Sequence, residues 1–457
     1  MSKVIIVSSD SHAAMPTDLW PQYVERRYHE LLPQVQQEDE LNREVLWMFN
    51  NLRLSPDYDV FDREQLFRSG RYAGLWDPQI RLEELDRDGV AAEVVHHGDF
   101  RIMDVFHNIM GGEYPLDVWD AGARAYDRWA ADTFGRWDDR FLLVSAIGSC
   151  ADMDAALAQL DWIADHGFVG TYAPGYMRYR GMPELTDDSW TPFWARCEEH
   201  GLVVVLHAGY GNEQGFIHRE MQRCYRETKG RGGTDQDLLA ALTGGIFNQE
   251  FFTDVKPRRA MAQLMLSGVF DRHPGLKVAL TENRADWLPV TLRHLDARYA
   301  EHREDLPARR PPSEYWPTNW LAGLSFIHRA EVEMRDEIGI ETMVFGRDYP
   351  HTEGTWPNTR EFMAVAFEGV PDDEVRLMLG ENAVRFFDLD RAELAEVAER
   401  VGPDVGEING RAAAVDPALV EHLTRRSGLL KAAEGDARLA ATDAMVREDL
   451  VAAGVHV

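Results

Sequence analysis

The sequence predicts an α/β fold: a TIM-type (β/α)8 barrel with long βα-loop insertions and a C-terminal helical extension. Two observations predict it. Short apolar, β-branched segments separated by helical periodicity recur eight times before Asp388, as expected for strands that are buried on both faces. Three of these segments end in side chains that can bind a metal, and such barrels carry their active sites at the C-terminal ends of the strands.

The eight predicted strands share apolar residues and are followed by amphipathic helices, such as those expected at residues 152–166 and 188–200. Eight such units fit a closed barrel better than an open sheet. The strands are expected at residues 4–9, 91–97, 142–148, 168–172, 202–208, 277–282, 321–326 and 342–347.

Two connections, residues 13–80 and 209–265, are too long for a minimal barrel. Both leave C-terminal strand ends, so we expect them to fold over the active face. A covered site suits a bulky or apolar substrate or an unstable intermediate. Alternatively, the insertions only pack against the barrel or a partner subunit. The sequence thus predicts a barrel domain over residues 1–388 and a helical extension over 389–457, which would support a lid or mediate contacts in a homodimer.

The composition restricts the classes of partner. A net charge of −30 without a visible basic patch argues against nucleic-acid binding. The chain contains no run of about 18 apolar residues, so the sequence predicts no membrane span. The N-terminus lacks the basic segment followed by an apolar stretch that marks a secretory signal, so we do not expect one. The three widely spaced cysteines, Cys150, Cys197 and Cys224, fit a reducing compartment. We therefore expect a cytoplasmic protein that acts on a small molecule.

The candidate metal ligands follow three of the predicted strands. Asp10 and His12 are two residues apart, so their side chains point the same way on a strand. His207 precedes small residues that leave room for a metal and a substrate, and Asp348 follows the last strand. Asp348 could be a ligand or the base that takes a proton from metal-bound water. Alternatively, Asp10 caps a helix and His207 is a core histidine.

These residues belong to motifs that resemble the amidohydrolase superfamily, in particular its amidohydrolase-2 branch, which contains aminocarboxymuconate-semialdehyde decarboxylase and the resorcylate decarboxylases. The resemblance covers the chain from Val4 to about Asp388. It implies a TIM-type barrel with a divalent metal held by Asp10, His12, His207 and Asp348. The motifs are Ser9-Asp10-Ser11-His12, His207-Ala208-Gly209, Thr281-Glu282-Asn283-Arg284-Ala285-Asp286-Trp287-Leu288-Pro289 and Gly346-Arg347-Asp348-Tyr349-Pro350-His351.

The chain departs from the superfamily's pattern at several strand ends. Asp10 replaces the first histidine of the usual H-x-H pair, and Glu282 stands where hydrolytic relatives carry histidine. The fourth strand ends at Tyr172 without the lysine or glutamate that bridges two metals in binuclear hydrolases. The second strand ends in adjacent histidines, His96 and His97, of which one must face the lumen.

Together these positions offer six ligands of mixed type, which could serve two metal ions: Asp10, His12, His207, Glu282, Asp348 and one of His96 and His97. Mixed imidazole and carboxylate ligands are typical of non-haem iron. With the missing lysine, this set resembles the TIM-barrel non-haem diiron monooxygenases of bacterial diterpenoid biosynthesis, the platensimycin type. Alternatively, Glu282 only orients a ligand histidine, and His96 and His97 pack in the core or hydrogen-bond to Asp99.

The resemblance to the monooxygenases implies two iron ions per chain, O2, an electron donor and a bulky, terpenoid-like and possibly CoA-linked substrate of secondary metabolism. We expect Asp348, His351 and Arg284 to be catalytic, with Arg284 gripping a carboxylate or phosphate and His351 moving a proton. The alternative is a hydrolase or non-oxidative decarboxylase of a small carboxylic acid with one zinc or manganese ion. A third hypothesis is a barrel without catalytic function, used for binding or scaffolding.

Overall fold

The structure is a computed structural model, which describes residues 3–54, 58–99, 101–137, 139–242, 255–325, 327–351, 354–427, 436–452 and 455. Four predictions extend beyond the described residues. They are the part of the first insertion at 55–57, the part of the second insertion at 243–254, the last residue of the strand expected at 321–326, and segments of the C-terminal extension.

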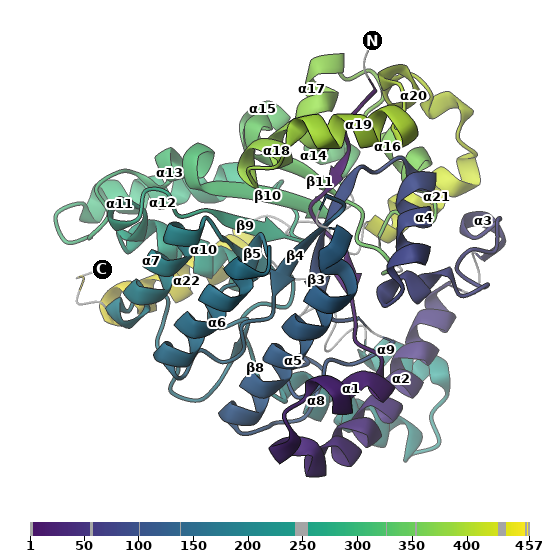
Figure 1. The fold of residues 1–457 in the computed structure, drawn as a ribbon. Helices are drawn as coiled ribbons and strands as arrows, with labels where there is room; N and C mark the ends of the chain where they lie inside the picture. Colours follow the sequence, from purple (N-terminus) through teal and green to yellow (C-terminus); the bar gives the residue numbers. More distant parts are fainter. Residues whose placement is uncertain are drawn as a thin grey trace.

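The fold is a barrel of eight parallel strands surrounded by helices (Figure 1). Backbone hydrogen bonds close the ring between the first and last strands, from Ser9 N to Phe345 O at 2.8 Å and from Asp348 N to Asp10 O at 2.9 Å. A short strand, β2 (His12–Ala13), continues the first strand and pairs with β3. In order around the ring, the strands are β1 (Val7–Ser8), β3 (Ala92–His97), β4 (Phe141–Ser145), β5 (Gly170–Tyr172), β7 (Val203–His207), β9 (Val278–Thr281), β10 (Trp320–Ser325) and β11 (Met343–Gly346).

The predicted fold class is confirmed, and each of the eight predicted segments overlaps one of the barrel strands, although β4 and β10 each begin one residue earlier than expected. Every residue of these strands is buried, which explains their continuous apolar and β-branched sequences. The helices between them begin and end at ordinary signals. Asp152 caps α6 (Met153–Asp165) by accepting from Ala155 N, and Gly201 ends α7 (Thr191–His200) in the left-handed conformation.

Other helices of the outer layer connect the strands. They are α4 (Pro78–Asp88), α5 (Leu116–Phe134), α10 (Val255–Leu266), α11 (Val269–Arg272), α12 (Leu288–His302), α13 (Pro312–Asn319), α14 (Arg329–Glu333), α15 (Arg335–Ile338), α16 (Thr359–Ala366), α17 (Asp372–Arg376) and α18 (Asn382–Phe386).

The two long insertions meet over one end of the barrel, where Figure 1 shows α1, α2, α8 and α9 together. The first insertion contains α1 (Trp20–Tyr23), α2 (Leu32–Leu54) and α3 (Tyr58–Phe61), and the second contains α8 (Phe216–Lys229) and α9 (Asp235–Leu242). A short two-stranded sheet, β6 (Met177–Arg178) with β8 (Asn212–Glu213), leads into α8. An apolar cluster separate from the main core joins both insertions to the loop after β3. Its members include Val45, Ile109, Met110, Met221 and Leu238.

The C-terminal extension is helical in its described part: α19 (Arg391–Val401), α20 (Val405–Asn409), α21 (Pro417–Ser427) and α22 (Asp436–Ala452). Asp449 of α22 accepts hydrogen bonds from Arg259 Nε at 2.9 Å and Gln263 Nε2 at 2.8 Å on α10. The last helix therefore packs against the barrel's outer layer, while the domain boundary at residue 388 stays a prediction. None of the described helices combines the length and apolar character needed to cross a membrane.

Candidate metal centre

Side chains from four strand ends converge inside the barrel mouth. Asp10 Oδ1 lies 3.4 Å from His207 Nε2 and 3.6 Å from His12 Nε2. His12 Nε2 is also 3.3 Å from Asp348 Oδ1, and His207 Nδ1 is 3.5 Å from Glu282 Oε2. One ligand atom from each of Asp10, His12, His207 and Glu282 lies within 4.8 Å of the others. The strand ends thus bring together five of the residues that the sequence predicts as ligands.

Backbone contacts turn the histidine nitrogens toward this centre. His12 Nδ1 donates to His97 O at 3.2 Å and His207 Nδ1 donates to Ala208 O at 3.2 Å, so each ring presents Nε2 to the carboxylates. Ser325 Oγ donates to Asp10 Oδ2 and fixes that carboxylate. Such contacts define the tautomer and orientation that metal-binding histidines need.

Two of the acidic residues adopt a backbone conformation that is unusual for side chains with a Cβ. Glu282 has a φ of 54° and Asp348 a φ of 53°. Such conformations persist only where the surroundings hold them, and they are concentrated at functional sites. Each residue directly follows its strand, β9 or β11, so the turn out of the strand aims the carboxylate into the barrel mouth.

Burial and charge set the protonation of the centre. Burial lowers the pKa of His12 well below its usual value, and repulsion from the charges that His351, His207 and His96 can carry lowers it further. Burial alone would lower the pKa of His207 and raise that of Asp10. The attraction between the two side chains outweighs burial, so the pKa of His207 is raised and the pKa of Asp10 is lowered. Burial and the Asp348 charge raise the pKa of Glu282 well above its usual value. Burial and the neighbouring charges therefore favour a neutral imidazole at His12 and a protonated carboxyl at Glu282.

The donor set fits a divalent cation. Among the described residues, histidines are the only basic side chains that contact Asp10 and Glu282, and His12 Nε2 makes no hydrogen bond. Buried carboxylates without a compensating positive charge are strongly unfavourable. Neutral imidazoles and carboxylates in this number are suitable ligands for zinc or manganese. A cation would compensate the carboxylates and occupy the lone pair of His12.

The two adjacent histidines of β3 are turned differently. His96 Nε2 donates to Ser9 O at 3.2 Å and lies 3.9 Å from Asp10 Oδ1. His97 Nδ1 instead hydrogen-bonds with Asp104 Oδ2 at 2.8 Å. His96 therefore borders the Asp10 side of the centre, whereas His97 belongs to a separate group of side chains.

A cavity of about 60 Å³ opens onto the centre. Ile109, Met110 and Ala208 add apolar side chains to its wall, and the loop after β3 supplies several of the lining residues. Its lining residues are His12, His97, Gly98, Asp99, Asp104, Asn108, Ile109, Met110, Tyr176, His207, Ala208, Glu282 and His351. Asp104, Asn108 and Tyr176 were not among the candidates from the sequence. The D-x-x-H spacing of Asp104 and His107 is the one signal that could have pointed to this loop.

Of the remaining candidates, His351 lies at the cavity and Arg284 is engaged elsewhere. His351 stacks on the His12 ring at 4.0 Å, and its Nδ1 lies 2.9 Å from Asp348 Oδ1. Arg284 does not line the cavity. Its guanidinium contacts Glu331 Oε1 at 3.0 Å and Asp286 Oδ2 at 3.4 Å. The geometry thus gives no support to the expectation that Arg284 grips a substrate.

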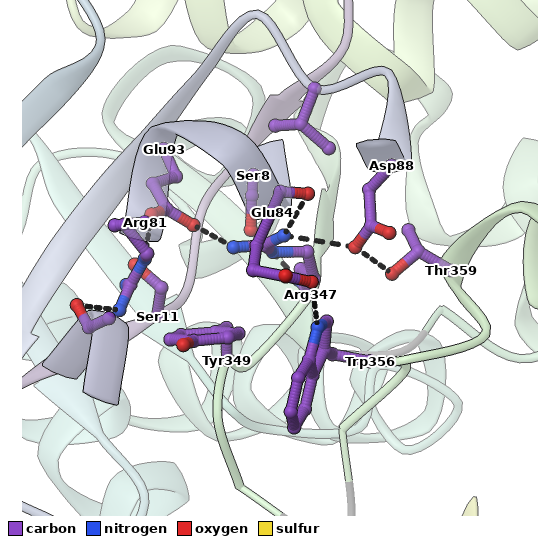
Figure 2. Close-up of polar contacts among 12 residues, drawn as sticks. Ser8, Ser11, Arg81, Glu84, Asp88, Glu93, Arg347, Tyr349, Trp356 and Thr359 are labelled. Carbon is purple, nitrogen blue, oxygen red and sulfur yellow. Dashed lines mark hydrogen bonds and ion pairs between the residues drawn. The ribbon is translucent and has the colours of Figure 1, made fainter. Parts of the chain in front are cut away.

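Arg347 lies on the outer side of the strands, within a buried ionic network (Figure 2). It pairs with Asp88 at 2.9 Å and with Glu93 at 3.1 Å. Glu93 also pairs with Arg81, whose Nη1 donates to His12 O at 2.9 Å. The network therefore connects α4, β3 and the end of β11 to the backbone of a candidate metal ligand.

A family model described as "Amidohydrolase" matches residues 13–389. A γ-resorcylate decarboxylase of Rhodococcus jostii (strain RHA1) is 29% identical over 284 residues, which are 60% of this chain and 78% of that protein. A 2-amino-3-carboxymuconate-6-semialdehyde decarboxylase of Dictyostelium discoideum is 21% identical over 327 residues, 70% of this chain and 78% of that protein.

Solved structures show the same fold. An amidohydrolase of Mycobacterium avium subsp. paratuberculosis K-10 superposes with a TM-score of 0.59 at 17% identity, covering 84% of this chain and 99% of that one. A dihydroxybenzoic acid decarboxylase of Polaromonas sp. JS666, with bound manganese and the inhibitor 2-nitroresorcinol, gives a TM-score of 0.55 at 17% identity. It covers 86% of this chain and 99% of that one.

These comparisons contradict the main functional prediction. The sequence relatives are named decarboxylases, so the expectation of a diiron monooxygenase of diterpenoid biosynthesis is wrong, and the alternative of a non-oxidative decarboxylase is favoured. Two iron ions, O2 and an electron donor find no support in them. The error has a chemical origin, because a set of imidazole and carboxylate ligands suits several metals and several reactions.

Proposed function

Because the chain belongs to the amidohydrolase family, we propose that it is a metal-dependent, non-oxidative decarboxylase of a small, preferably aromatic, carboxylic acid. The observation that carries the proposal is the convergence of Asp10, His12, His207 and Asp348 at the C-terminal strand ends beside a cavity. In barrels of this type, that face holds the catalytic residues.

We assign Asp10, His12, His207 and Asp348 as the residues that hold one manganese or zinc ion. When bound, such a cation supplies positive charge that polarises oxygen atoms of the substrate. His12 and His207 already present Nε2 to the two aspartates through their backbone contacts. Binding would therefore require little rearrangement of the imidazoles.

The reaction needs a proton rather than an oxidant. The bond between the substrate carbon and its carboxylate breaks, CO2 leaves, and the electron pair that remains on the carbon takes up a proton. Glu282 is the candidate donor, because its carboxyl lines the cavity and burial raises the pKa of that carboxyl, which favours its protonated form. His351 lies 2.9 Å from Asp348 and lines the same cavity, so it can exchange protons there with solvent.

The cavity wall favours a flat, partly apolar substrate. Ile109, Met110 and Ala208 offer apolar contacts, and Tyr176 offers an aromatic ring. Water would compete with the substrate for the proton and for the cation, and the buried wall restricts its access. These contacts support an aryl or unsaturated acid over a hydrophilic one.

A metal-dependent assay of CO2 release tests the proposal. The chain is stripped with a chelator, reloaded with Mn²⁺ or Zn²⁺, and incubated without oxygen with γ-resorcylate and other hydroxybenzoates. We expect CO2 release that requires the cation and disappears in His12→Gln. The control is His273→Gln, because His273 is a buried histidine that contacts Glu198 and does not line the cavity. We expect this variant to keep its activity. Turnover that depends on oxygen, or no release from any of the acids, would overturn the proposal.

A further inference from the structure

A second group of buried metal-binding side chains lies beside the cavity, outside the centre described above. His97 comes from the end of β3, and Asp104 and His107 come from the loop between β3 and α5. Their exposed fractions are 6%, 4% and 1%. One ligand atom from each lies within 4.8 Å of the others. Asp104 Oδ2 is 2.8 Å from His97 Nδ1 and 3.9 Å from His107 Nε2.

The loop is shaped so that both of its side chains reach the same point. Phe106, between Asp104 and His107, has a φ of 65° and reverses the direction of the backbone. His107 Nδ1 donates to Val105 O at 2.9 Å, so Nε2 carries the lone pair on the side of Asp104. The loop packs against Gly122 of α5, where a Cβ would lie 1.9 Å from Val105 O.

The polar atoms of this group are not satisfied within the described residues. His97 Nε2, His107 Nε2 and Asp104 Oδ1 have no hydrogen-bond partner there, although all three are buried. Buried polar groups are nearly always paired, so each such atom requires an explanation. Because His107 Nδ1 donates to Val105 O, the Nε2 atom of the same ring is left as an acceptor. Acceptor atoms gathered around a carboxylate suit a cation.

We propose that His97, Asp104 and His107 hold a second divalent cation of the zinc or manganese class. Two imidazoles and one carboxylate form a ligand set that proteins use for first-row metals, with positions left for water or substrate. His97 and Asp104 also line the cavity, so an oxygen atom of the substrate can complete the coordination. The site shares no ligand with the first centre and does not depend on the proposed decarboxylation.

Metal counting on the full chain tests the proposal. The stripped protein is titrated with Zn²⁺ in a calorimeter, and bound zinc is measured by elemental analysis after desalting. We expect two equivalents for the wild type and one for His107→Gln or Asp104→Asn. The control His273→Gln keeps two equivalents, and His12→Gln keeps one, held by the second site. A single equivalent that is lost only in His12→Gln, or two that survive both loop variants, would overturn the proposal.

A measurement on the unmodified protein covers the case in which the loop variants fail to fold. Hydrogen exchange of residues 101–115 is followed while the first and second equivalents of Zn²⁺ are added. We expect protection of this loop to rise with cation binding to His97, Asp104 and His107, and unchanged exchange at two equivalents would contradict the site. If zinc follows the expected pattern but no acid is decarboxylated, the second site stands and the proposed function fails.

Discussion

Replacement of Arg81 by methionine tests whether the buried network behind the strands positions the metal centre. Arg81 is fully buried, pairs with Glu93 and donates to the carbonyl oxygens of His12 at 2.9 Å and Gly74 at 3.2 Å. Its guanidinium also lies 4.1 Å above the ring of Tyr349 (Figure 2). Methionine is similar in length but has neither the charge nor the donors.

The expected loss of folding stability depends on the contacts that Glu93 keeps after the substitution. Breaking a buried ion pair destabilises a protein by about 3–5 kcal/mol. Because Glu93 keeps its contact with Arg347 at 3.1 Å, we expect a loss near the lower limit, about 3 kcal/mol. At roughly 2.1 cal/mol/K of unfolding entropy per residue, a 457-residue chain has about 1 kcal/mol/K, so the melting temperature should fall by about 3 °C.

The same change should weaken metal binding, because the backbone of His12 loses the donor that fixes its carbonyl oxygen. Loss of such supporting contacts weakens metal affinity by about 10- to 100-fold. Calorimetric melting and zinc titration measure the two effects. The control is Arg223→Met, whose exposed pair with Glu227 at 2.9 Å should contribute less than about 1 kcal/mol. The reasoning is refuted if Arg81→Met melts within 1 °C of that control and binds zinc equally well.

Three further predictions concern single side chains or glycines. Glu282→Gln should reduce decarboxylation by about 10²- to 10⁴-fold with metal content unchanged. In the metal-loaded wild type, kcat/KM should fall as pH rises through the pKa that Glu282 has beside the cation, and a pH profile of both proteins would show this. Burial raises the pKa of Asp127 to about 6, so its protonated form stabilises the fold at low pH and this stability is lost as pH rises through 6. Urea unfolding at pH 4 and pH 7 should show the wild type losing up to about 3 kcal/mol relative to Asp127→Asn. Gly122→Ala should displace the loop after β3 and lower the melting temperature, whereas Gly135→Ala, with nothing within 4 Å of the added Cβ, should be neutral or slightly stabilising.

The barrel strands could be predicted because each is buried on both faces, which leaves an uninterrupted apolar segment such as Val203–Leu206. The positions of Asp10, His12, His207 and Asp348 followed from the same geometry, since the C-terminal ends of parallel strands meet at one face. No assumption about the loops was needed. The part of the site that lies on strand ends is therefore visible in the sequence.

The loop side chains could not be predicted in this way. Asp104 and His107 lie in a segment without periodicity, and their approach depends on the turn at Phe106 and on the contact with α5. Arg284 was assigned to the cavity because it is close in sequence to Glu282, but Glu331, far along the chain, engages its guanidinium. Proximity in sequence does not fix where a side chain points, and a count of ligand types does not fix which reaction the ligands support.

Proton and metal binding at the first centre must oppose each other. The raised pKa of Glu282 arises from burial and from the negative charge of Asp348. A cation held beside Asp348 would offset that charge and lower the pKa of Glu282, so metal binding releases protons. We therefore expect zinc affinity to rise with pH, and the apparent binding enthalpy to vary with the ionisation enthalpy of the buffer. In Glu282→Gln this proton release should diminish. An equal release in both proteins would show that the proton resides elsewhere.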